Sequence, residues 1–241
     1  MFPSHSRRTA FSIIELMVAV SIFVGLLVVV FLFFRFGTRA FLTATQRQGV
    51  QADALRVMDG LQADLKRTSG ASVLFKRDVS RTRVIDGVTV HRDVVSFASL
   101  KDWSDPSNTE NFDVTNAQPI WNRYWVYYAT NNADRGSIVR LKIDPLPPPI
   151  APRRLTTPQL TQLSLDIPEN NNYDGQVPAF VYLARNVYEF NFDVVSRNQF
   201  QISLKLQEKR RLRPDGGKIE GMETYQLIMN VRPENTTPQD F

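Results

Sequence analysis

A single carboxylate near the start of the chain adjoins an apolar run, where a charged side chain is energetically unfavourable. Glu15 is followed by a run in which no charged residue occurs from Leu16 to Phe34. A carboxylate in a bilayer core costs a few kcal/mol unless something compensates it. Glu15 therefore either lies at the interfacial end of an ordinary membrane anchor or makes a specific interaction that compensates its charge.

Residues suited to enzymatic catalysis are sparse. The chain has no cysteine and two histidines, His5 near the N-terminus and His91 on an expected strand. A histidine-based metal site or a Ser-His-Asp triad would therefore rest almost entirely on His91. No nucleophile-elbow, P-loop or dinucleotide-binding motif occurs. The sequence predicts a protein that is not an enzyme and has no cofactor.

Two loops are rich in carboxylates, whose oxygens are the ligands that calcium prefers. Calcium sites are conceivable there, but neither loop follows the EF-hand spacing, so solvated turns are the favoured interpretation. The two groups are Asp102, Asp105, Glu110 and Asp113, and Asp166, Glu169 and Asp174. No metal site is predicted.

A basic run at residues 205–218 is suited to contacts with phosphates of DNA or lipid headgroups. Acidic residues interrupt the run and no aromatic residues alternate with the cations for base stacking. A solvated sheet edge is the favoured interpretation, and DNA is not an expected partner. The residues of this possible basic patch are Lys209, Arg210, Arg211 and Arg213.

The apolar run has the length of a membrane span. Its 19 uncharged residues extend roughly 28 Å as a helix, close to the thickness of a bilayer core. It ends in Phe-Phe-Arg-Phe rather than in the small residues of a signal-peptidase site. Arginines flank it on both sides, so charge orients it weakly, and we expect the bulk of the chain, which follows the span, to lie outside.

The stretch "AFSIIELMVAVSIF" resembles the N-terminus of type IV pilins and pseudopilins. The resemblance implies a leader at residues 1–10, cleavage between Ala10 and Phe11 by a membrane-embedded aspartyl prepilin peptidase, and methylation of the new amine. Glu15 would then be the fifth residue of the mature chain. Ala10 stands where glycine is commonest in the family.

If the chain is a pilin or pseudopilin, Glu15 can form an ion pair with a neighbouring subunit. Cleavage would leave a cationic amine on Phe11, and in an apolar filament core the carboxylate can pair with the amine of a neighbouring subunit. The two costly groups satisfy each other and fix the axial register between subunits. The alternative, that Glu15 only marks the end of an anchor, stays open at this point.

The elements that position these residues are a long helix followed by strands. The predicted organisation is a transmembrane or filament-core helix at residues 11–36, an amphipathic continuation at 37–69 and a β-rich head at 70–241. Asp86-Gly87 predicts a hairpin turn, and further strands are expected near residues 94–99, 123–130, 137–143, 187–195, 199–207 and 224–232. The predicted class is α+β, a long helix packed on an antiparallel sheet.

The C-terminal strands and the stretch "ALRVMDGLQADLKR" resemble those of J-type (W-type) minor pseudopilins and minor pilins. This implies a non-catalytic subunit in the inner membrane with a periplasmic head, assembled into a filament or its tip. Expected partners are prepilin peptidase, other pilin or pseudopilin subunits and inner-membrane lipid. Without the leader, which holds Arg7 and Arg8, the side-chain charge falls from +5 to +3. The alternative function is a membrane-anchored periplasmic binding or adhesive domain that does not polymerise.

Overall fold

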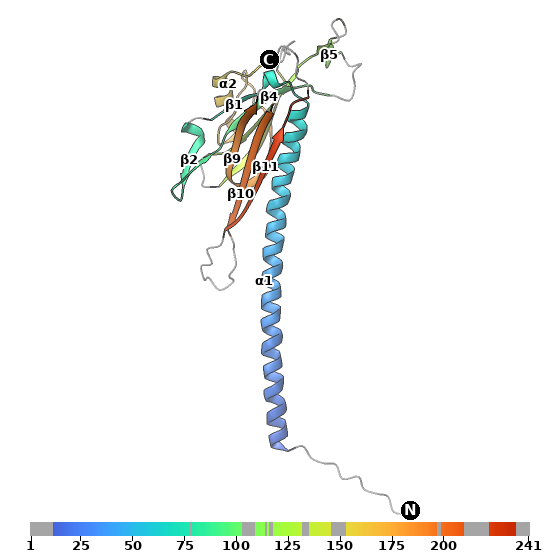
Figure 1. Cartoon of the computed structure of the whole chain (residues 1–241), viewed down its shortest axis with the longest axis vertical. Coiled ribbons are helices and arrows are strands. Elements are labelled where there is room, and N and C mark those ends of the chain that lie inside the picture. The colour runs from blue at the N-terminus through green and yellow to red at the C-terminus, as the bar shows by residue number, and fades with distance from the viewer. Residues whose placement is uncertain are drawn as a thin grey trace, which may run out of the picture. The chain divides into compact units, whose positions relative to one another are not determined.

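The structure is a computed structural model, and it describes residues 12–77, 79–102, 109–113, 115, 118–131, 135–145, 153–196, 199–209 and 222–234. It combines one long helix with a β-rich head (Figure 1). Residues 1–46 and 47–241 form two units, which we describe separately.

Helix α1 spans Ile13–Lys66, 54 residues without a break. Between Leu16 and Phe34 it is apolar on all sides, and its large side chains are exposed, as expected of a helix that is surrounded by lipid or by other protein. In the second unit it becomes amphipathic. One stripe is buried against the sheet, as the sequence pattern predicted, and consists of Val50, Ala54, Val57, Met58, Leu61 and Leu65.

The head contains a seven-stranded, wholly antiparallel sheet in the order β1-β4-β7-β8-β9-β10-β11. This confirms the predicted α+β class. Neighbouring strands of this sheet follow one another along the chain, as consecutive strands of a sheet usually do. The strands are β1 (Leu74–Lys76), β4 (Val94–Ser99), β7 (Arg123–Ala129), β8 (Gly136–Ile143), β9 (Ala179–Ser196), β10 (Gln199–Lys209) and β11 (Met222–Val231).

Two small hairpins form two-stranded sheets of their own. The pair β2 (Thr82–Ile85) and β3 (Val88–His91) turns at Asp86 and Gly87, whose φ angles are 51° and 77°. Two consecutive positive φ angles define the tight hairpin turn that the Asp-Gly pair predicted. The second hairpin pairs β5 (Phe112–Asp113) with β6 (Gln118–Pro119).

The sheet has an apolar cluster on each face, and α1 contributes to the first of them. The second apolar cluster involves β4, β7 and β8 on the face away from α1, and helix α2 (Thr157–Gln162) contributes Leu160 to it. Thr156 caps α2 through a capping box with Gln159. Short 3-10 helices complete the described elements at Gly70–Ser72, Val79–Arg81 and Pro168–Asn170.

Strand β9 is longer than predicted because it pairs with two different neighbours. Its first half pairs with β8 and its second half with β10. Near the change of partner, Asn186 has a φ of 60° and the β8 register shifts. The fully buried Arg92 donates to the carbonyls of Val187 (3.1 Å) and Thr130 (2.9 Å), which holds this irregular backbone in place.

Candidate functional site

The first turn of α1 is closed by hydrogen bonds that join Ser12 to Ile14, Glu15 and Leu16. The Ser12 carbonyl accepts from the Leu16 N–H (3.1 Å), and the Ser12 Oγ accepts from the Ile14 N–H (3.3 Å). In return, Glu15 Oε2 accepts from the Ser12 N–H (3.0 Å). Ser12 is therefore the N-cap residue, and we use the name capping box for this arrangement, although the Ser12 Oγ accepts from the second helical N–H rather than from the third. The sequence analysis missed it, although the Ser-x-x-Glu spacing before an apolar run was there to be found.

The capping box explains how Glu15 is tolerated before it meets any partner. Its carboxylate lies in the first helical turn, where backbone N–H groups point outward and favour negative charge. Glu15 is also the first acidic residue of the chain, since the next is Asp53. Among the residues that the structure describes, the hydrogen bond from Ser12 engages Oε2, and Oε1 can accept from a further donor.

The helix that follows Glu15 is long and apolar enough to span a membrane. Its most apolar 18-residue window has a mean hydropathy of 3.1, and none of that window is buried within the protein. Side chains such as Phe31, Phe33 and Phe34 are each at least 65% exposed. An apolar surface of this extent requires lipid or protein around it.

Several predicted residues fall outside the described part of the chain. Ala10 and Phe11, the predicted cleavage residues, precede it, and so their placement is not tested. Of the possible basic patch, Lys209 ends β10, while Arg210, Arg211 and Arg213 lie outside the described residues. The patch therefore stays a prediction.

His91 is a strand residue, as expected. It is partly buried on β3, and its Nδ1 lies 3.4 Å from the Thr82 Oγ1 on β2. Within the described ranges, no three His, Cys, Asp or Glu side chains gather closely enough to hold a metal ion.

A polar contact joins the second half of α1 to the sheet. The Asp64 carboxylate accepts from the Tyr127 hydroxyl (2.5 Å) and pairs with the Arg140 Nη2 (2.7 Å). The Arg140 guanidinium also lies over the Trp125 ring, 3.7 Å from its centroid. Burial raises the pKa of Asp64 above its usual value, and the hydrogen bond from Tyr127 and the charge of Arg140 only partly oppose this rise.

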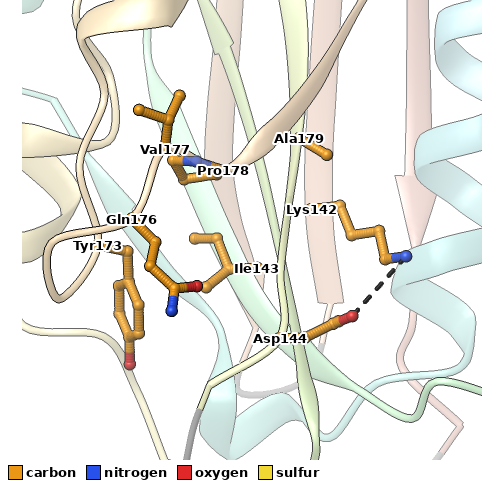
Figure 2. A pocket seen from close by; sticks show the side chains of 8 residues that line it. All are labelled: Lys142, Ile143, Asp144, Tyr173, Gln176, Val177, Pro178 and Ala179. Atoms are coloured by element: carbon orange, nitrogen blue, oxygen red, sulfur yellow. Dashed lines mark ion pairs between the residues drawn. The ribbon is translucent and has the colours of Figure 1, made fainter.

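A pocket of about 210 Å³ lies beside the end of β8 and is drawn in Figure 2. Ile143 points towards Tyr173 and Gln176, whereas Lys142 and Asp144, 3.7 Å apart, lie on the other side of the strand (Figure 2). The described lining contains no serine, cysteine or histidine.

The architecture, a long apolar N-terminal helix that continues onto an antiparallel sheet, is pilin-like. The chain matches no family model, no curated protein and no solved structure.

Proposed function

We propose that the chain is a non-catalytic minor pilin or pseudopilin, a subunit of a type IV pilus or a type II secretion pseudopilus. The observation that carries the proposal is the position of Glu15. It is a lone carboxylate in the first turn of an apolar helix of membrane-spanning length, and the same helix continues into a β-sheet head. Capping of the first turn engages Oε2 of this carboxylate, and the proposal assigns Oε1 to a neighbouring subunit.

In this proposal Glu15 pairs with the N-terminal amine of a neighbouring subunit. Prepilin peptidase removes residues 1–10, and the new amine on Phe11 becomes methylated and stays cationic. In an apolar filament core the free amine and the carboxylate would each be costly, but together they neutralise one another. Oε1 of Glu15 accepts from the neighbour while Oε2 keeps its bond from Ser12.

The subunit is held in the inner membrane by one span, and its head lies in the periplasm until it joins the filament or its tip. Its partners are the peptidase, other pilin or pseudopilin subunits and membrane lipid. We include neither catalysis nor DNA binding in this function.

The first experiment is mass and N-terminal analysis of the protein extracted from membranes. We expect a mature chain that begins with N-methylated Phe11, and precursor when the peptidase is absent. A bulky residue in place of Ala10 should leave precursor, whereas Ala10→Gly should be processed at least as well. An intact Met1, or a start beyond Phe36, would refute the proposal.

The second experiment separates assembly from anchoring. Glu15→Leu should leave membrane insertion intact or improved, because the variant removes a desolvated carboxylate, but should lose co-purification and crosslinking with other subunits. Glu15→Asp should be partly defective because its side chain is shorter. Normal assembly of the leucine variant would instead support a membrane-anchored binding or adhesive domain that does not polymerise.

A further inference from the structure

The residue at which α1 begins is set by side chains. Ser12 lies outside the helix and caps it, and the bonds that do so come from the Ile14 N–H to the Ser12 Oγ and from the Ser12 N–H to Glu15. No proline or glycine occurs between Pro3 and Gly25, so no helix-breaking residue marks this boundary. The capping box is therefore what stops the helix from starting earlier.

We propose that Ser12 is a positioning residue for removal of the leader. Its capping box fixes the start of α1 at Ile13, which follows the predicted scissile bond between Ala10 and Phe11 in the sequence. This inference rests on the proposed function. Peptidase cleavage adds water across the bond and leaves a carboxylate on Ala10 and an amine on Phe11, which takes up a proton at neutral pH. A bond already wound into a helix would have to unwind before its carbonyl could be attacked.

The residues before Ser12 show that a different N-cap residue would change where the helix begins. Ala10 and Phe11 have no feature that prevents helix formation, and the nearest capping residue type before them is Thr9. A helix capped at Thr9 would have Ala10 and Phe11 as its first two residues. The scissile bond would then lie within the first turn. Weakening the cap at Ser12 thus shifts the boundary towards the bond that the peptidase must reach.

The test uses the full-length chain and purified prepilin peptidase in phospholipid vesicles, with leader removal followed by mass. Ser12→Ala should be cleaved about fivefold more slowly, the change expected when a serine N-cap is replaced by alanine. Ser12→Asp should restore the rate, because aspartate is an equally good N-cap. Ser21→Ala is the matched control, since the Ser21 Oγ only donates to the Met17 carbonyl (2.8 Å) within the helix. It should be cleaved at the wild-type rate.

Glu15→Gln distinguishes this inference from the proposed function. Glutamine can fill the third position of a capping box, so cleavage should proceed normally, while the missing charge should impair assembly. Ser12→Ala should show the reverse result. Its leader should be cleaved slowly, but the mature chain that forms should assemble normally.

Equal cleavage rates for Ser12→Ala and the wild type would overturn the positioning role and leave the proposed function standing. An aspartate variant as slow as the alanine variant would also overturn it, because the peptidase would then be reading the serine itself. Failure to cleave the wild type at Ala10 would remove both proposals.

Discussion

Gly136 occupies a position in the head that has no room for a side chain. It begins β8 opposite Val187 of β9, and a Cβ built on it would lie 2.3 Å from the Thr130 carbonyl oxygen and 3.2 Å from the Arg92 Nη1. The same carbonyl accepts from the Arg92 Nη1 (2.9 Å), and the Thr130 N–H donates to the Ser137 carbonyl (2.9 Å). Gly136→Ala must therefore displace backbone that a buried guanidinium and a strand pairing hold in place.

The expected loss of stability has two parts. Overpacking a tight interior costs about 1–3 kcal/mol, and loosening a hydrogen bond made by a buried charged group costs about 1.5–3 kcal/mol. Together they predict a fall of about 3–5 kcal/mol in the free energy of unfolding. For a head of about 200 residues this corresponds to a drop of roughly 10 °C in Tm.

Gly60→Ala is the matched control. A Cβ at Gly60 would meet only the Tyr127 hydroxyl oxygen, at 3.9 Å, an ordinary contact. Because alanine is the better helix former, this variant should gain about 0.5–1 kcal/mol. Urea unfolding of both proteins in detergent, followed by tryptophan fluorescence, measures the difference. If Gly136→Ala unfolds within 1 kcal/mol of the wild type, or if Gly60→Ala loses as much, the packing argument is wrong.

Two further predictions concern pH and the boundary of the head. Because the pKa of Asp64 is raised in the folded chain, its contribution to stability is fully present below its unfolded pKa and is lost as the pH rises through the folded pKa. Asp64→Asn should flatten this dependence above about pH 4 in urea titrations, and an unchanged pH profile would contradict the assigned shift. Removal of the residues before Phe41 should leave a soluble, monomeric head, because the buried stripe of α1 remains on its sheet; size-exclusion chromatography tests this. A chain that begins at Ser72 lacks that stripe and should aggregate, so a folded, soluble fragment from there would disprove the packing role of α1.

Predictions from the sequence held best where the signal is local. The stripe from Val50 to Leu65 needs only helical spacing, and the turn at Asp86 and Gly87 needs only two residues that tolerate positive φ. Strand β4 lies at the predicted residues 94–99 because a run of alternating or continuous apolar residues already selects an extended backbone.

Predictions were incomplete where an element depends on distant parts of the chain. The pattern indicated a strand at residues 187–195, but β9 begins at Ala179, because β8 offers a pairing edge to its first half. The short helix α2 was not predicted. Six residues carry too little periodicity to be recognised, and α2 contributes Leu160 to the second apolar cluster.

By itself the sequence determined the apolar helix, the single carboxylate at its start, the hairpin turn and the positions of most strands along the chain, since each follows from residues that are close together in the sequence. Only the tertiary structure decided that Arg92 is buried among carbonyls 38 and 95 residues away, that Gly136 can carry no side chain, and that Asp64 meets Tyr127 across 63 residues. Arginine and aspartate side chains far apart in sequence carry no mark of the partner they will find. Their burial becomes favourable only when the folded chain has brought the hydrogen-bond acceptors and donors to them.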